Sequence, residues 1–264
     1  VNPQPTLIDP PAGLLNGLNY VDQNTVILKL YAPEKNNIYV LGDFNEWSPS
    51  LAYHMNLSQD LKTWWIQISG LQPDTKYGYQ YYIDGVQRFA DPLSLRVADP
   101  SNDGSINAAT YPSPYAYPTG LTTGFISLFE TNPPSFSWQN DGYQKPAQKG
   151  LMIYELLVRD FVAKRNYQTL IDTLAYLDQL GVNAIELMPV GEFEGNESWG
   201  YNPSFHMALD KYYGSPEKFK ELVDSCHGRG ISVIVDNVLN HAFGQNPMVN
   251  MYWDAVNARP AANN

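Results

Sequence analysis

Residues 231–241, which read ISVIVDNVLNH, decide the fold of the second half of this 264-residue chain. The stretch follows Gly230 and begins with an aliphatic run, which is typical of a strand buried on both faces. It then turns polar, with Asp236, Asn240 and His241. In parallel sheets, ligands bind where strands end. A strand followed by an ordinary turn would look the same, since Asn and Asp are common turn residues, so the flanking sequence has to decide.

The flanking sequence alternates strands with helices. Residues 151–158 and 183–190 read as apolar strands. Between them, apolar residues recur at helical spacing over residues 167–180. A Ser-Pro pair at 215–216 begins a second helix, which a glycine ends before Ile231. This order predicts a parallel sheet with crossover helices. The loop over residues 191–214 is long, and long loops in compact domains are often functional.

The first half of the chain has a different sequence pattern, in which short β-branched or aromatic runs are separated by turns. Close spacing of such runs predicts a small β-sandwich. The predicted strands are Thr25–Tyr31, Ile38–Leu41, Thr63–Ser69, Tyr77–Ile83 and Val86–Phe89. Pro, Tyr, Ser, Thr and Gly then dominate, as in a stiff linker. We therefore predict a β-sandwich over residues 1–107, a linker over 108–149 and an α/β domain over 150–264.

Composition excludes several classes of partner and cross-link. The net charge of -11 and the pI of about 4.7 disfavour nucleic acid and anionic membranes, because the field of the protein repels both. The single cysteine, Cys226, excludes an internal disulfide, and its place on an apolar helix face predicts a buried thiol. No apolar run is long enough to span a bilayer. Val1 in place of Met is compatible with secretion, so we favour an extracellular or periplasmic location over a cytoplasmic one.

Two aromatic residues of the long loop, Trp199 and Tyr201, follow a strand end, as Asp236 and His241 do. Because the ends of parallel strands meet at one edge, we expect these four side chains to lie at a common mouth. Aromatic rings beside hydrogen-bonding groups suit a pyranose, whose C–H faces stack on rings. The alternatives are loop packing for Trp199 and a buried ring with a satisfied hydroxyl for Tyr201. For the three loop glutamates we expect solvated charge: Glu192, Glu194 and Glu197.

Four motifs in this half resemble the first part of the catalytic (β/α)8 TIM barrel of glycoside hydrolase family 13, the α-amylase family. Residues 153–161 resemble its first strand region, and residues 181–189 resemble its second strand. Residues 199–203, WGYNP, resemble the loop that follows, in the form common in pullulanases, branching enzymes and some amylases. Residues 236–241, DNVLNH, resemble the first conserved region of the family. Leu157 departs from the pattern, since many members have histidine there.

The resemblance implies a role for each matching residue. Tyr201 would stack under the sugar at the cleavage subsite, with Trp199 beside it as a further substrate-binding residue. His241 would donate a hydrogen bond to the primary hydroxyl of that sugar, and Asp236 would support catalysis by orienting an arginine near the nucleophile. Asn240 corresponds to a calcium ligand in many α-amylases, although several subfamilies lack the metal. Calcium is thus the cofactor that the resemblance implies.

Residues 18–100 resemble the immunoglobulin-like modules of carbohydrate-binding module family 48. The resemblance rests on residues 41–47, LGDFNEW, and residues 79–85, YQYYIDG. Trp47 matches the first tryptophan of the sugar platform in glycan-binding members, but Gln80 stands where the platform lysine would be. A lone aromatic gives little stacking area, so we favour packing against the catalytic domain over sugar binding for this module.

The resemblance implies an α-amylase-like hydrolase that cleaves α-glucosidic bonds of starch or glycogen by a retaining mechanism. A debranching or branching enzyme is the alternative within the class, and a non-catalytic glycan-binding module is the alternative outside it. In this family the catalytic carboxylates follow the fourth, fifth and seventh strands, so we expect them beyond residue 264 and expect this chain alone to be inactive. Three strands also leave an open sheet edge, so we expect self-association or disorder beyond about residue 150.

Overall fold

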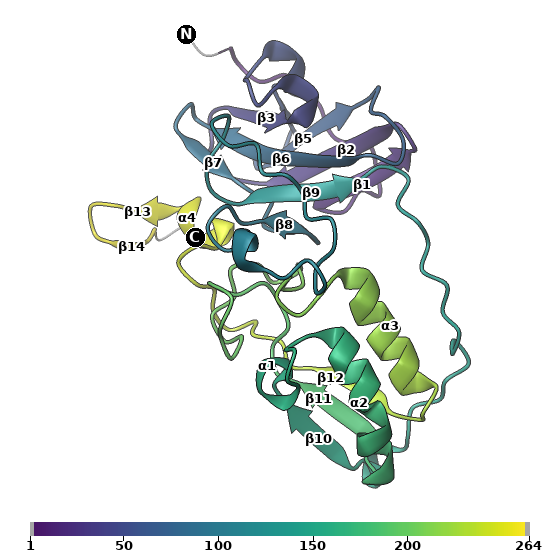
Figure 1. Cartoon of the computed structure of the whole chain (residues 1–264). Helices are drawn as coiled ribbons and strands as arrows, with labels where there is room; N and C mark the ends of the chain where they lie inside the picture. Colours follow the sequence, from purple (N-terminus) through teal and green to yellow (C-terminus); the bar gives the residue numbers. More distant parts are fainter. Residues whose placement is uncertain (1–2, 262–264) are drawn as a thin grey trace. The chain divides into compact units, whose positions relative to one another are not determined.

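The computed structural model describes residues 3–261 and forms two compact units (Figure 1). Unit 1 combines the chain up to Ser101 with Tyr115–Pro134 and the segment from Asn246 onward. Unit 2 combines Asn102–Pro114 with Ser135–Gln245. Each unit is therefore assembled from separate stretches of the chain. The predicted outer domain ends, residues 1 and 264, lie outside the described residues.

Unit 1 is built around two antiparallel sheets (Figure 1). One sheet has the order β1-β2-β5-β4 and the other the order β3-β6-β9-β8, with β7 paired to β6. The hairpin β13–β14 and the short helix α4 follow near the end of the chain. The bounds are β1 Gly17–Asp22, β2 Thr25–Tyr31, β3 Ile38–Gly42, β4 Asn56–Leu57, β5 Thr63–Ile68, β6 Lys76–Ile83, β7 Gln87–Phe89, β8 Val97–Ala98, β9 Ile126–Glu130, α4 Pro247–Asn250, β13 Trp253–Asp254 and β14 Arg259–Pro260.

The core of unit 1 lies between the two sheets. Alternate residues of β2, Val26, Leu28 and Leu30, are buried and belong to one hydrophobic cluster with Tyr79 and Tyr81 of the other sheet. Alternation of this kind is what a strand with one face on a core requires. The predicted short strands of the first half are thus confirmed as elements of a two-sheet fold.

The predicted linker over residues 108–149 is wrong in its middle part. Residues 126–130 form β9, which pairs with β6 and β8. The hydroxyl of Tyr115 donates to the carboxylate of Asp43 at 2.7 Å, and its ring lies against Gly78, where a Cβ would come within 2.6 Å of the hydroxyl. The Pro- and Ser-rich flanks conceal this strand, because the alternating run is only five residues long.

The segment from Asn246 onward packs in unit 1 and not with the sheet of the predicted α/β domain. Met251 is 4% exposed and belongs to the core cluster of unit 1. The Nζ of Lys35 donates to the carbonyl of Met251 at 2.6 Å, and the hydroxyl of Tyr252 donates to the carbonyl of Pro33 at 2.7 Å. The Lys35 ammonium also lies 4.1 Å from the centre of the Tyr252 ring. Sequence pattern could not reveal this, because the partners lie more than two hundred residues away.

Unit 2 has a three-stranded parallel sheet in the order β10-β11-β12 (Figure 1). This confirms the predicted order of strand, helix, strand, helix, strand. Both long helices begin with a side-chain cap: Asn166 accepts from the Thr169 amide, and Ser215 accepts from the Lys218 amide as predicted. The bounds are β10 Ile153–Leu156, α1 Val158–Phe161, α2 Tyr167–Gln179, β11 Ala184–Leu187, α3 Pro216–His227 and β12 Ser232–Val235.

The two long helices cover one face of this sheet. Leu174 of α2 and Leu222 and Cys226 of α3 are fully buried in one cluster with Ile185 of β11. The predicted burial of Cys226 is thus confirmed. On the opposite face, Ile153 is 49% exposed. One side of the sheet is therefore closed by helices, and the other is open among the described residues.

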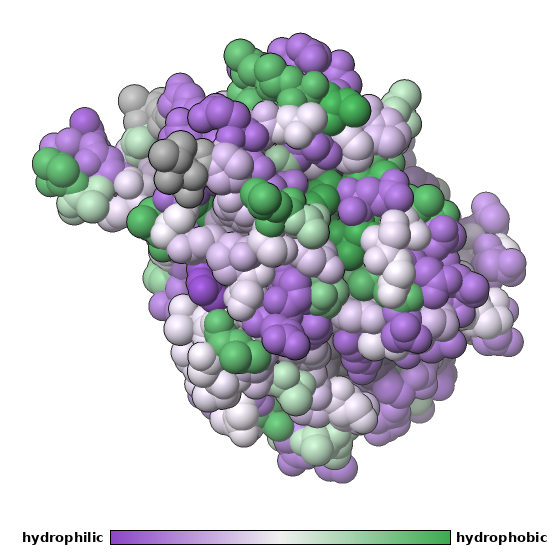
Figure 2. Space-filling view, turned by 90° about the horizontal axis from the view of Figure 1, so that it is seen from above, coloured by the Kyte–Doolittle hydropathy of each residue, from purple (hydrophilic) through white to green (hydrophobic). Residues whose placement is uncertain are grey.

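Among residues 3–261, every helix is too short or too polar to cross a bilayer. Figure 2 shows hydrophobic residues scattered among polar ones on the face seen from above.

The packing of the C-terminal segment generates a stability prediction. Met251→Ala should lower the free energy of unfolding of unit 1 by about 2–5 kcal/mol, because it opens a cavity in a filled core. Hydrogen exchange of the β2 and β6 amides measures this. Met248→Ala is the matched control, since Met248 is 40% exposed and should cost much less. Equal effects of the two substitutions would contradict the packing described.

Candidate functional site

The candidate site lies where β11 and β12 end. Leu187 pairs with Val235 at the last position of both strands, and the Asp236 amide donates to the Leu187 carbonyl at 3.0 Å. The chain therefore leaves both strands at the same level of the sheet. The long loop after β11 and the polar residues after β12 start from one edge, as the sequence predicts.

Tyr201 and Asp236 meet directly at this edge. The Tyr201 hydroxyl donates to Oδ2 of Asp236 at 2.6 Å, and the ring remains 40% exposed. This hydrogen bond, with burial and the negative charge of Asp236, raises the pKa of Tyr201 to about 12. The phenol therefore stays protonated and holds the carboxylate, while its ring face is open to a ligand. The alternative that Tyr201 is a buried ring is wrong.

His241 contacts the backbone of Tyr201. Its Nε2 lies 2.7 Å from the backbone carbonyl of Tyr201, and because a carbonyl only accepts, Nε2 carries the proton. The Nε2 of His206 lies 3.1 Å from the His241 carbonyl. In this arrangement a neutral His241 presents Nδ1 as an acceptor. The implied donor role toward a sugar hydroxyl would need the charged ring or a turned ring.

Gly200 makes the turn that brings Tyr201 to Asp236. Its φ is +91°, in the left-handed region, and a Cβ there would lie 2.3 Å from the Pro189 carbonyl oxygen. The Gly200 amide donates to Ser198 Oγ at 2.9 Å. Trp199, on the other side of Gly200, is 63% exposed, so it is available for stacking rather than used for loop packing.

The space beside these residues is small. A cavity of about 80 Å³ lies next to Asp236 and is also lined by His206, Met207 and Gly200. Small-molecule pockets usually measure about 300–1,000 Å³. The described residues therefore form a wall of a site, with rings and polar atoms on its surface, rather than an enclosed pocket.

A buried charge cluster holds the base of the loop. The Nζ of Lys211 lies 2.6 Å from Oε1 of Glu192 and 3.2 Å from Oδ1 of Asp103. Lys211 is 5% exposed and Glu192 is 4% exposed. Asp210 accepts from the amides of Phe193 and Tyr212. The cluster thus joins both ends of the loop to each other and to the segment that carries Asp103.

The cluster has more carboxylates than cations, and this changes its protonation. Burial raises the pKa of Glu192 to about 8 and that of Asp210 to about 7, although Lys211 acts in the opposite direction. Burial alone would lower the pKa of Lys211, but the surrounding carboxylates outweigh it and raise that pKa. Oε2 of Glu192 has no hydrogen-bond partner among the described residues. The cluster as a whole holds more negative than positive charge, so a proton on one of its carboxyls near neutral pH reduces the excess buried charge.

The expectation for Glu192 is wrong, whereas the expectation that unit 1 does not bind sugar through Trp47 agrees with the burial of that ring. Glu192 is not solvated loop charge but a buried partner of Lys211, whereas Glu197 is exposed and pairs with Arg165 at 2.7 Å. Trp47 is 3% exposed, and its Nε1 donates to Asp43 at 3.1 Å. A ring with both faces packed cannot act as a sugar platform, so Trp47 is a core residue of unit 1.

Asn240 is exposed. Calcium takes six to eight oxygen ligands, usually including carboxylates. No group of three or more His, Cys, Asp or Glu side chains in residues 3–261 is arranged to hold a metal ion. Asn240 would supply one amide oxygen to a site that these side chains do not complete, so calcium binding stays a prediction.

Sequence reasoning missed Lys211 and Asp103, because a buried ion cluster has no local spacing pattern. Asp103 even fell in the predicted first domain, whereas the structure places it in unit 2. The signal in the sequence was the adjacent pair Asp210 and Lys211, which stands between Leu209 and two tyrosines.

The geometry of Gly200 generates one prediction. Gly200→Ala should displace the Trp199–Tyr201 turn and weaken the contact with Asp236, because the added Cβ meets backbone. The expected result is faster hydrogen exchange of the amides of residues 199–203. Gly195→Ala is the matched control: φ is +75° there too, but a Cβ meets nothing within 4 Å. If both variants exchange alike, the clash with Pro189 has no part in shaping the turn.

The protonation of Glu192 generates a second prediction. Its folded pKa of about 8 lies above the ordinary glutamate value of 4.5, so its stabilising contribution is complete below pH 4.5 and is lost as pH rises through about 8. Glu192→Gln should therefore reduce the fall in urea midpoint between pH 5 and pH 8. Glu197→Gln, at an exposed ion pair, should keep the wild-type slope. An unchanged slope in Glu192→Gln would show that its carboxyl is ionised throughout.

Comparison with known proteins shows what this chain is similar to. Residues 137–257 match the family model described as alpha amylase, catalytic domain. The chain is 32% identical over 213 residues to a malto-oligosyltrehalose trehalohydrolase of Arthrobacter ramosus, covering 75% of this chain and 32% of that protein. It is 28% identical over 236 residues to a 1,4-α-glucan branching enzyme of Rhodococcus jostii, covering 88% and 29%.

Solved structures agree on the fold. The pullulanase of Bacillus acidopullulyticus has a TM-score of 0.63 at 24% identity, covering 86% of this chain and 30% of its own. A Group B Streptococcus pullulanase in complex with maltotetraose has a TM-score of 0.64 at 20% identity, covering 88% and 34%. The chain spans about a third of the length of these relatives. Residues 137–257 thus match the α-amylase catalytic-domain model, and the solved structures share the fold of the chain.

Proposed function

We propose that this chain forms part of a glycoside hydrolase that cleaves α-glucosidic bonds of starch- or glycogen-type glucans. Within it, Tyr201, Asp236 and His241 form one wall of the sugar subsite. The observation that carries the proposal is the pair of contacts at Tyr201, 2.6 Å from its hydroxyl to Asp236 and 2.7 Å from its carbonyl to His241. They hold an exposed aromatic face beside a carboxylate and an imidazole.

The chemistry of the wall fits a glucosyl unit. The Tyr201 and Trp199 rings offer flat apolar faces, on which the C–H faces of a pyranose stack. Asp236 can accept from sugar hydroxyls, and a neutral His241 can accept at Nδ1. The net charge of -11 favours a neutral substrate over an anionic one. The named relatives, a trehalohydrolase and a branching enzyme, support an α-glucan as that substrate.

Hydrolysis with retention needs two carboxyl groups about 5–5.5 Å apart. We propose that Asp236 supports this pair and that the pair itself comes from further strands of a (β/α)8 barrel. Within residues 3–261, β10 and β12 form the two edges of the sheet and the face that carries Ile153 is open, which supports such a continuation. An uncovered edge of this kind also favours self-association of the chain by itself. Unit 1, with two packed sheets, would be an immunoglobulin-like module that accompanies the barrel.

A second candidate activity is glucan transfer. The similarity to the Rhodococcus jostii branching enzyme, which extends over 236 residues, favours it. Both activities need the same glucosyl subsite. They differ in the molecule that accepts the cleaved glucan and not in the residues that form this wall. A purely glycan-binding role for unit 1 through Trp47 has little support, because the ring is packed on both sides.

Maltotetraose binding to the 264-residue chain tests the proposal. Met207 lines the cavity beside Asp236, so its ¹³C-methyl NMR signal reports on this wall. We expect maltotetraose to shift that signal with saturation. Tyr201→Ala should weaken binding roughly tenfold, as loss of an aromatic stacking contact does. Tyr201→Phe keeps the ring and should lose less.

Tyr176→Ala serves as the control, because Tyr176 lies on α2 and is 52% exposed, more than Tyr201. Its affinity should match that of the wild type. A Met207 signal that maltotetraose leaves unchanged would reject the subsite, as would an unchanged affinity in Tyr201→Ala.

A further inference from the structure

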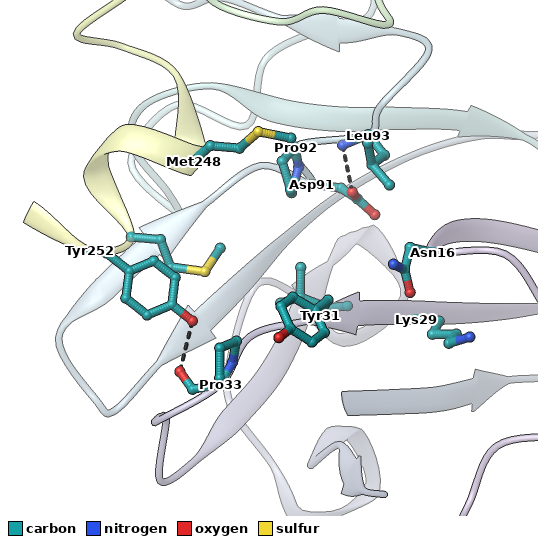
Figure 3. A pocket seen from close by; sticks show the side chains of 11 residues that line it. Asn16, Lys29, Tyr31, Pro33, Asp91, Pro92, Leu93, Met248 and Tyr252 are labelled. Atoms are coloured by element: carbon teal, nitrogen blue, oxygen red, sulfur yellow. Dashed lines mark hydrogen bonds between the residues drawn. The ribbon is translucent and has the colours of Figure 1, made fainter. Parts of the chain in front are cut away.

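A pocket of about 380 Å³ lies on unit 1, between the end of β2, the loop at residues 91–93 and the segment at residues 248–252 (Figure 3). This volume falls within the usual range for small-molecule sites, about 300–1,000 Å³. Every lining residue belongs to unit 1. The Tyr201 wall belongs to unit 2, so the pocket is a separate feature of the chain.

The walls of the pocket are flat and apolar. Figure 3 shows the rings of Tyr31 and Tyr252 on one side and Pro92, Leu93 and Met248 on the other. Tyr31 is 53% exposed, so its ring is not used by the core. Opposed aromatic, proline and aliphatic surfaces form a slot that suits a ring with two apolar faces.

Polar groups gather at one end of the slot. Figure 3 places Asn16 and Lys29 together there. Lys29 donates one N–H to the Leu14 carbonyl at 2.9 Å, and an ammonium group has three to give. Asn16 is exposed and carries both an amide donor and an acceptor. A ligand with apolar faces and a hydroxylated edge would satisfy both parts of the slot.

The charge of the pocket favours a neutral ligand. Asp91 is 1% exposed, and its carboxylate already accepts from the hydroxyls of Tyr79 and Tyr81 and from the Leu93 amide. Because these hydrogen bonds use the carboxylate of Asp91, it holds this side of the pocket in place and does not serve as a cation site. A single lysine on a chain with a net charge of -11 gives an anion little attraction.

We propose that this slot binds a glucosyl unit of a neutral α-glucan, as a second carbohydrate site formed wholly by unit 1. The identity of the ligand rests on the proposed function, because an α-glucan is the polymer that the Tyr201 wall would hold. The sugar would lie between Tyr31 and Leu93, with its hydroxyls toward Asn16 and Lys29. Unit 1 would thus bind glucan at Tyr31, and not at the packed Trp47.

The experiment follows the methionine methyl signals of the 264-residue chain on addition of maltotetraose. Met248 lines the slot and is exposed, whereas Met207 reports on the Tyr201 wall, so one spectrum separates the two sites. We expect a saturable shift of Met248 that Tyr31→Ala weakens roughly tenfold. Tyr201→Ala and Tyr176→Ala should leave the Met248 response unchanged. An unchanged Met55 signal, from the unit 1 core, verifies folding.

Each outcome decides one of the two proposals. If maltotetraose shifts the Met207 methyl signal but not the Met248 signal, the second site is rejected and the proposed function is retained. A Met248 shift that survives in Tyr31→Ala also overturns it. A Met248 shift that Tyr31→Ala abolishes, without any response at Met207, supports the slot and counts against the Tyr201 wall. Hexanol serves as an apolar probe. If hexanol shifts the Met248 signal and maltotetraose does not, the slot binds apolar ligands and the proposal is overturned.

Discussion

The buried ammonium group of Lys211 is the constraint on which the candidate site depends. It pairs with Glu192 at 2.6 Å and with Asp103 at 3.2 Å, so it fastens the start of the long loop to its end and to a distant segment. Removing one partner of such a pair typically costs about 3–5 kcal/mol, because the other charge stays buried. The bridges between Gly191 and Leu209 and between Phe193 and Pro203 close the loop further. With its base fixed, the loop presents its Trp199–Tyr201 turn to Asp236.

The two units use their aromatic residues in different ways. In unit 1, Trp47, Trp64, Tyr79 and Tyr81 are buried and build the core or anchor Asp91. In unit 2, Trp199 and Tyr201 are exposed at the ends of parallel strands. The high tyrosine and tryptophan content therefore has two physical causes. Tyr201 and Tyr31 are exposed rings beside polar groups, which is the kind of surface on which a sugar ring stacks.

Local periodicity allowed the sheet of unit 2 and its site edge to be predicted. Parallel strands separated by helices must end at one edge, so the convergence of Tyr201, Asp236 and His241 followed from the order of elements. The short strands of unit 1 followed from alternation. What could not be predicted depends on distant partners: the burial of Glu192 by Lys211, the pairing of residues 126–130 with β6, and the attachment of Met251 to the first unit. The burial of Trp47 was missed for the same reason, since its neighbour Tyr115 lay in the predicted linker.

The site rests on the hydrogen bond between the side chains of Tyr201 and Asp236 at one edge of the sheet. A double-mutant cycle of Tyr201→Phe and Asp236→Asn, read out by hydrogen exchange of the amides of residues 199–203, measures the strength of this contact. We expect a coupling free energy of at least about 0.5 kcal/mol, the lower end for residues in direct contact. If the effects of the two substitutions add within about 0.3 kcal/mol, the side chains act independently and the site is not built on this hydrogen bond.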